Sequence, residues 1–193
     1  MKQELFKQAI VEFDKANSLD PNLITIGDEQ KPRELAYSEW LSDWVQRLNP
    51  NASEPLQLAA RCQHLKRWEI PRSKYPDGLK GYTKWKKELA EFHAQEGEKI
   101  LKKIGYDPAT IERVKEINLK KNLKSDSEVQ TIEDALCLVT LAYQIEDFSK
   151  KHSDEKMIEI IRKTWGKMSN KAREEALKLK YSERVLSLIQ KAI

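Results

Sequence analysis

One segment of the chain, residues 59–72, combines a histidine with arginines and a tryptophan inside an ordinary helical pattern. Arg61, His64 and Trp68 are spaced i, i+3 and i+7, so a continuous helix would place them on one face. An imidazole flanked by a guanidinium and an indole suits a site for a metal ion and a phosphate group better than an apolar core. The prediction of a functional site therefore starts here.

Three other residues are candidate partners of His64. His93 belongs to an apolar helical stripe, and Glu39 lies at the edge of another. Asp134 shares a helix face with apolar residues, where a carboxylate is costly unless it is paired or bound to a metal. Because the four residues belong to four predicted helices, a bundle can assemble them around one divalent metal, which would be Mn, Fe, Zn or Mg. A metal-bound water would then be the catalytic nucleophile.

Each of these residues also has a purely structural interpretation. His93 can be a core histidine with one hydrogen bond, and Asp134 can form a salt bridge to Arg61 or to another arginine. Glu39 can belong to a solvated surface. The sequence leaves both interpretations open for each residue.

Basic and aromatic residues near His64 predict an anion site. The expected substrate contacts are Arg61, Arg67, Trp68, Arg72, Lys74, Tyr82, Lys163 and Lys167. The arginines and lysines would hold phosphoryl oxygens, and the aromatic rings would stack on a nucleobase. In the alternative interpretation the aromatic rings fill a core or a hinge, and Ser169 near Lys167 caps the next helix.

Helical periodicity dominates the chain. Helices are expected at about residues 5–13, 32–48, 54–68, 83–104, 111–117, 127–143, 157–165, 172–179 and 185–189. The run from Ala135 to Tyr143 is apolar nearly all round and predicts the central buried helix. Residues 68–82 form an irregular connection, and no strand-period run is found. The prediction is an all-α, single-domain multi-helix bundle over residues 1–193.

Composition limits the function classes. The 193 residues include 35 basic and 31 acidic ones, a net charge of +4, which is mild for a dedicated nucleic-acid binder. The two cysteines suggest buried thiols and no disulfide framework. The sequence shows no secretory segment and no apolar run of about 18 residues, so a cytoplasmic protein without a membrane span is expected. The oligomeric state stays open.

Several short motifs resemble an uncharacterised family of bacteria and fungi, catalogued as a domain of unknown function. The motifs are Gln63-His64, Ile70-Pro71-Arg72, Tyr75-Pro76, Gly81-Tyr82, Phe92-His93-Ala94, Glu133-Asp134, Lys163-Thr164-Trp165 and Lys167-Met168-Ser169. The resemblance covers nearly the whole chain. Some members carry a glutamyl-tRNA synthetase label, although this chain has no recognisable synthetase nucleotide fold.

The helix order also resembles the HD superfamily of metal-dependent phosphohydrolases. In that resemblance His64 matches the histidine of the His-Asp pair and Asp134 matches the late aspartate. Glu39 stands where the first histidine would be, and His93 matches the start of the intervening helix. Leu65 replaces the aspartate of the pair, which is the main departure from the superfamily pattern.

The resemblance implies an HD-like metal-dependent hydrolase acting on a phosphorylated small molecule or nucleotide. In this hypothesis Glu39, His64, His93 and Asp134 are the catalytic and metal-binding residues. The alternative is a non-catalytic RNA- or nucleotide-binding module on a degenerate HD-like scaffold. That module would use the same basic and aromatic side chains and bind RNA less tightly as salt increases.

Overall fold

The computed structural model describes residues 2–123 and 125–193. Its elements follow the order α1 (Lys2–Asn17), β1 (Leu23–Ile26), β2 (Glu29–Pro32), α2 (Arg33–Leu48), α3 (Glu54–Cys62), η1 (Arg67–Glu69), η2 (Arg72–Lys74), α4 (Gly78–Ile104), α5 (Pro108–Asn118), α6 (Ser127–Val139), η3 (Thr140–Gln144), α7 (Ile145–Lys151), α8 (Asp154–Trp165), α9 (Asn170–Leu177) and α10 (Glu183–Ala192). The all-α prediction is confirmed, since one small hairpin is the only sheet within the described ranges.

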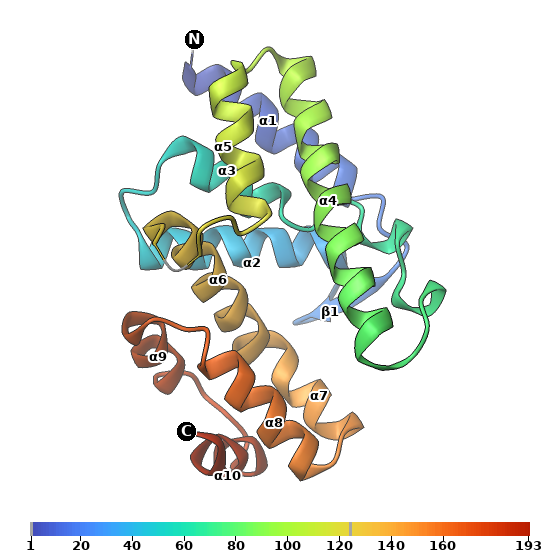
Figure 1. Cartoon of the computed structure of the whole chain (residues 1–193), viewed down its shortest axis with the longest axis vertical. Coiled ribbons are helices and arrows are strands. Elements are labelled where there is room, and N and C mark those ends of the chain that lie inside the picture. Colours follow the sequence, from blue (N-terminus) through green and yellow to red (C-terminus); the bar gives the residue numbers. More distant parts are fainter. Residues whose placement is uncertain (1, 124) are drawn as a thin grey trace.

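The helices form two groups joined by α6, as Figure 1 shows. Helices α1–α5 lie in the upper part of the view and α7–α10 in the lower part. Helix α6 packs against α2 and continues through the π-helix η3 into α7. Its residues Ile132 and Leu138 are fully buried, as are Leu41 of α2 and Leu56 of α3. The predicted central buried helix is found over residues 135–139, whereas the predicted run continues as the π-helix η3 and ends at the exposed Tyr143.

Polar side chains fix the beginnings of most helices. Helices α3, α5, α6, α8, α9 and α10 each begin after a Ser or Asp whose side chain accepts a backbone N–H of the first turn. These bonds satisfy donors that a helix leaves unpaired at its start. The predicted cap at Ser169 is among them. No described helix is both long and apolar enough to cross a bilayer.

Two local expectations were wrong. Residues 23–32, where no strand was expected, form an antiparallel hairpin in which Leu23 pairs with Pro32 and Ile26 with Glu29. Helix α3 ends at Cys62, so His64 lies in the following turn and Trp68 in the 3-10 helix η1. Arg61, His64 and Trp68 therefore do not share one helix face.

Candidate functional site

A turn after α3 positions His64. Lys66 has a left-handed backbone with φ of +51°, and its N–H donates to Asn17 Oδ1 at 3.1 Å. Leu65 is 1% exposed and packs in the core, whereas the side chain of His64 keeps about 20% of its surface exposed. The position at which the HD pattern has an aspartate is thus occupied by a core residue.

His93 of α4 lies beside His64, with the ring centroids 5.8 Å apart. Its Nδ1 lies 2.7 Å from the carbonyl oxygen of Leu65. A carbonyl only accepts, so Nδ1 carries the proton and Nε2 presents a lone pair. Nε2 is buried and has no hydrogen-bond partner within the described part of the chain. Burial lowers the pKa of His93 to about 3, so its ring is neutral near pH 7.

Glu34 of α2 is the carboxylate closest to His64 that the structure reveals. Its Oε2 is 3.8 Å from His64 Nδ1, and its Oε1 is 3.1 Å from Arg33 Nε and 3.9 Å from Arg67 Nε. The Glu34 side chain is 1% exposed, and Oε2 has no hydrogen-bond partner among residues 2–123 and 125–193. Burial raises the pKa of Glu34 above its usual value, against the opposing effect of Arg67 and Arg33.

Sequence reasoning missed Glu34, although a signal was present. Glu34, Ser38, Leu41, Val45 and Leu48 follow one another at i, i+4, i+7, i+11 and i+14, and all five are buried. Glu34 therefore begins the apolar stripe of α2, where a carboxylate is unusual. The same test that singled out Asp134 would have found it.

Burial lowers the pKa of His64 well below its usual value, and the positive charges of Arg67, Lys120 and Arg33 nearby lower it further. A neutral imidazole surrounded by cations is a poor neighbour for another positive ion. The same surroundings favour an anion, which would contact the guanidinium and ammonium groups.

Two aromatic rings hold cations at this site. The guanidinium of Arg67 lies over Trp85, 5.0 Å from the ring centroid, and Trp85 Nε1 donates to the Ile70 carbonyl at 2.9 Å. Lys86 Nζ lies 5.6 Å from the centroid of Tyr82. Burial lowers the pKa of Lys86, and the charges of Lys167 and Lys120 add to this effect.

Glu133 of α6 anchors those two loop lysines. It forms ion pairs with Lys120, and with Lys167 at 3.4 Å, while its own side chain is 5% exposed. Burial alone would raise its pKa, but the ion pairs with Lys120 and Lys167 hold it below the usual value. Glu133 was not a predicted site residue, although its neighbour Asp134 was.

The carboxylate of Asp134 binds the N-cap residue of α9. Its Oδ1 accepts from Ser169 N at 2.8 Å and from Gln130 Nε2 at 2.9 Å, and its Oδ2 accepts from Ser169 Oγ at 2.5 Å. Ser169 is the N-cap of α9, so the carboxylate fixes the start of that helix. The salt bridge to an arginine that was the alternative interpretation of Asp134 is absent from the ion pairs of the described residues.

Glu39 and Arg61 belong to another cluster. Arg61 donates to both carboxylate oxygens of Asp14, at 2.6 and 2.8 Å, and lies 3.7 Å from Glu39. Glu39 also pairs with Lys31. The structure therefore brings His64 and His93 together, with Glu34 as their nearest carboxylate, and engages Glu39 and Asp134 with other partners.

The remaining predicted contacts divide in the same way. Arg67 and Tyr82 take part in the cation–aromatic contacts near His64, and Lys167 pairs with Glu133. Arg72 donates to the carbonyls of Tyr75 and Pro76, and so closes its own loop. Three other predicted residues make no contact with these groups among the described residues. Lys74 donates to the Glu69 carbonyl, Lys163 pairs with Glu159 along α8, and Trp68 is half-buried in η1.

No group of three or more His, Cys, Asp and Glu residues is arranged to hold a metal ion in the described ranges. The four predicted ligands are not assembled as one set, and cations surround the two that meet. The predicted divalent metal stays a prediction.

Comparison with known proteins places the chain in one family. Residues 7–189 match the domain of unknown function DUF4202. The chain belongs to that family. No curated protein and no solved structure matches this DUF4202 chain. The predicted resemblance to the uncharacterised family is thereby confirmed, whereas the similarity to HD hydrolases stays a prediction.

Proposed function

We propose that this DUF4202 protein binds a phosphorylated small molecule or nucleotide at the cluster around His64. One observation carries the proposal. Cationic side chains from separate segments gather there: Arg33 and Arg67 lie against Glu34, which is 3.8 Å from His64, and Lys86 lies over Tyr82 beside Trp85. Gln63, the residue before His64, donates to the Asn118 carbonyl at 3.5 Å, two positions before Lys120, and Glu133 pairs with both Lys120 and Lys167. Two carboxylates, Glu34 and Glu133, pair with four of them.

Convergence of like charges opposes folding unless something compensates for it. Several exposed lysines and glutamates form local pairs along single helices, as Lys163 and Glu159 do on α8. Around His64 the cations come from distant parts of the chain, and burial disfavours the charged forms of Arg67 and Lys86. Arrangements of this kind are typical of binding sites, where a ligand supplies the missing charge.

The side chains also suit phosphate chemically. The guanidinium of Arg67, 5.0 Å from the centroid of the Trp85 ring, has a planar fork of donors that suits two phosphoryl oxygens. Exposed Tyr82 lies beside Trp85, with ring centroids 5.8 Å apart, and offers an aromatic surface for a nucleobase.

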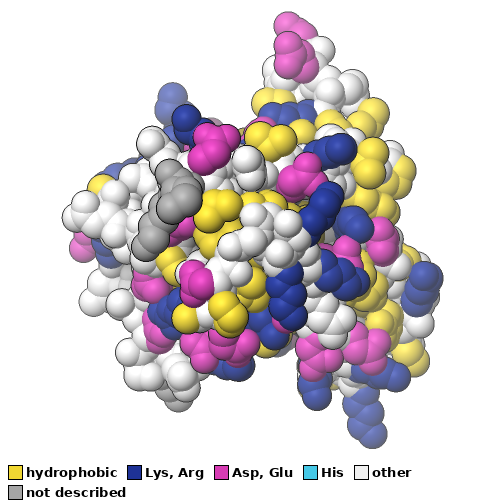
Figure 2. Space-filling view, turned by 90° about the horizontal axis from the view of Figure 1, so that it is seen from above, with side chains coloured by type: hydrophobic (Ala, Val, Ile, Leu, Met, Phe, Trp, Pro, Cys, Tyr) yellow, Lys and Arg dark blue, Asp and Glu magenta, His cyan; other side chains and the backbone are white. Residues whose placement is uncertain are grey.

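A small ligand is favoured over RNA because the positive charge is concentrated at one place. On the face shown in Figure 2, basic and acidic side chains alternate, and no large area of one sign is seen. An RNA groove would require a continuous basic path along the surface.

The test is calorimetric titration of the purified protein with a panel of phosphorylated metabolites and nucleotides, and with RNA over a range of salt. We expect saturable binding of small phosphate compounds, which Lys86→Met weakens about tenfold through loss of one charge-assisted contact. Lys87→Met is the matched control, since Lys87 is the next residue of α4 and its side chain is 78% exposed. Equal effects of the two substitutions, or binding of RNA alone, would contradict the proposal.

Hydrolysis of the bound compound by the predicted HD-like mechanism is a second candidate. Two atoms favour hydrolysis, because both are of the kind that bind divalent metals. They are the buried Nε2 of His93 and the Oε2 of Glu34 beside His64, neither of which has a hydrogen-bond partner among the described residues. The surrounding cations oppose a metal, so the binding proposal involves none. A hydrolase requires stoichiometric Mn, Fe, Zn or Mg in elemental analysis, and turnover that His64→Ala abolishes. Metal-free protein that shows no turnover with added Mn would contradict hydrolysis and leave binding intact.

A further inference from the structure

A cavity of about 290 Å³ lies between the first three helices of the chain. Phe6 and Ile10, one turn apart on α1, form its apolar wall. The polar lining residues come from α2 and α3: Ser42, Asp43, Gln46, Gln57 and Arg61. Asp43 lies nine positions after Glu34 on α2, which is about 14 Å along the helix axis. No lining residue of the cavity belongs to the cluster around His64, so the cavity is a second candidate site.

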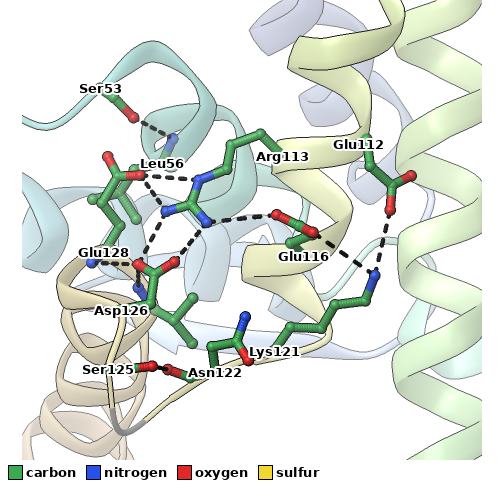
Figure 3. A network of polar contacts seen from close by, with 11 residues as sticks. Ser53, Leu56, Glu112, Arg113, Glu116, Lys121, Asn122, Ser125, Asp126 and Glu128 are labelled. Atoms are coloured by element: carbon green, nitrogen blue, oxygen red, sulfur yellow. Dashed lines mark hydrogen bonds and ion pairs between the residues drawn. The ribbon is translucent and has the colours of Figure 1, made fainter.

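Local contacts hold the wall that α3 provides. The helix begins at the cap of Ser53, whose Oγ accepts from Leu56 N at 3.3 Å, as Figure 3 shows. Two turns later Arg61 donates to both carboxylate oxygens of Asp14, at 2.6 and 2.8 Å, and so ties α3 to α1. The cavity is therefore formed by the fold itself, as small-molecule sites usually are.

The uncharged polar side chains of the lining are each anchored through a donor. Ser42 Oγ donates to a carbonyl of its own helix at 2.8 Å, and Gln46 Nε2 donates to the Pro50 carbonyl at 3.0 Å. Gln57 Nε2 donates to the Ala52 carbonyl at 2.8 Å. The side-chain oxygens of both glutamines accept no hydrogen bond from the described residues. They are acceptors for a ligand that brings N–H groups.

The positive charge of Arg61 is compensated within the protein. Its guanidinium is bound by the Asp14 carboxylate, and it also lies 3.7 Å from Glu39. Glu39 in turn pairs with Lys31. These four charges balance one another, so Arg61 gives the cavity no net positive charge.

Asp43 is the other charged residue of the lining. It is exposed, so it lies at the rim of the cavity, and it forms no ion pair among residues 2–123 and 125–193. The closest arginine along α2 is Arg47, whose guanidinium lies over the Trp44 ring, 5.1 Å from the centroid. The carboxylate of Asp43 therefore gives the cavity a negative charge that a cationic ligand would match.

We propose that this cavity binds a small organic ammonium compound, a primary amine on a short aliphatic or aromatic body. The ammonium group donates to the Asp43 carboxylate and to the amide oxygens of Gln46 and Gln57. The body packs against Ile10 and Phe6, whose ring also attracts a cation. The inference stands apart from the proposed phosphate site and goes beyond it.

A metal ion or an anion suits the cavity less well. No three His, Cys, Asp and Glu residues of the described chain are placed to hold a metal, and the α1 wall has no ligand atom for one. The volume is also about ten times the roughly 30 Å³ that one water molecule occupies in the liquid. An anion would face the Asp43 carboxylate and two amide oxygens, which repel it.

Calorimetric titration of the full chain tests the ligand class with benzylamine, benzyl alcohol and benzoate at one ionic strength and neutral pH. The three compounds share a ring and differ in the head group, and butylamine tests the aliphatic body. We expect both amines to bind saturably, with benzylamine at least about tenfold tighter than the alcohol or the acid, because it alone makes a charge-assisted contact to a carboxylate. Equal affinity for the three ring compounds, or no binding of either amine, would overturn the proposal.

A matched pair of variants tests the position of the site. Asp43→Asn keeps the shape of the side chain and should weaken benzylamine about tenfold. Asp28→Asn removes one exposed carboxylate from the hairpin turn, outside the cavity, and should bind as wild type. Circular dichroism verifies that both variants are folded, and phosphate binding should be unchanged in both. Equal affinities of the two variants for benzylamine would place the amine elsewhere and overturn the assignment.

Discussion

Replacing Asp134 distinguishes a structural carboxylate from a catalytic one. The residue is 4% exposed and accepts three hydrogen bonds from Ser169 and Gln130. One of the three donor groups has a second acceptor, because Gln130 Nε2 also donates to the Lys167 carbonyl. Ser169 Oγ accepts from Ala172 N in the cap of α9, and its O–H would lose its acceptor but is free to rotate. The main loss in Asp134→Ala is the charge-assisted bond from the Ser169 backbone N–H, which would be left buried and unpaired.

An unpaired buried donor costs about 1–3 kcal/mol, and lost packing of the carboxylate adds to this. We therefore expect Asp134→Ala to lower the free energy of unfolding by about 3 kcal/mol. For a chain of this size that is a fall in Tm of about 6–12 °C. Asp134→Asn keeps one oxygen acceptor and should lose about half as much.

Urea unfolding followed by circular dichroism measures the change. Asp154→Ala on α8 is the control, because Asp154 is about half exposed and its pair with Arg184 is worth less than about 1 kcal/mol. Folded Asp134→Ala protein should still bind the phosphate ligand. Unchanged unfolding together with lost binding or turnover would refute the capping role and support the predicted catalytic one.

Three further predictions concern the site and its supports. Burial raises the folded-state pKa of Glu34, so its ionisation above the usual pKa of 4.5 opposes folding. The free energy of unfolding of Glu34→Gln should therefore fall less between pH 4.5 and neutrality than that of wild type. Parallel pH profiles of urea unfolding for the two proteins would contradict this. Burial lowers the pKa of His93 to about 3, so wild type should lose stability as the pH falls from 6.5 toward 3, and His93→Asn should lose less. An identical fall in the free energy of unfolding of both proteins over this pH range would exclude the effect. Gly81→Ala should destabilise by about 1–3 kcal/mol despite the better helix propensity of alanine, because its Cβ would lie 1.9 Å from the Pro76 carbonyl oxygen. The control is Gly97→Ala, whose Cβ would meet Cys62 Sγ at 3.2 Å, and equal thermal shifts for the two variants would refute the clash.

Helices with clear apolar stripes and polar caps could be predicted from the sequence, because both signals are local. Leu41 and Val45 repeat at the spacing of one helix face, and Ser53 caps α3, which has Pro55 in its first turn. The hairpin could not be found in this way. Its strands have four residues each, and Leu23 and Ile26 remain exposed, so no alternating buried face marks them.

The end of α3 was missed for a physical reason. Glycine usually marks a left-handed residue after a helix, but here Lys66 takes that conformation and donates its N–H to buried Asn17. Asn17 lies 49 positions earlier in the chain. A single sequence contains no local signal for such a contact, and the turn that places His64 depends on it.

Three buried carboxylates, those of Asp134, Glu133 and Glu34, differ in how completely they are satisfied. Asp134 accepts hydrogen bonds at both oxygens from a helix cap and its neighbour, which is what a structural carboxylate requires. Glu133 relies on two lysines from separate loops, and Glu34 leaves Oε2 without a hydrogen bond among the described residues. Burial of an incompletely satisfied carboxylate is costly, so its retention requires a compensating benefit. Glu34 lies 3.8 Å from His64 and against Arg33 and Arg67, and Glu133 pairs with Lys120 and Lys167, whereas Asp134 forms no ion pair among the described residues. The ligand site is therefore assigned to Glu34 and Glu133.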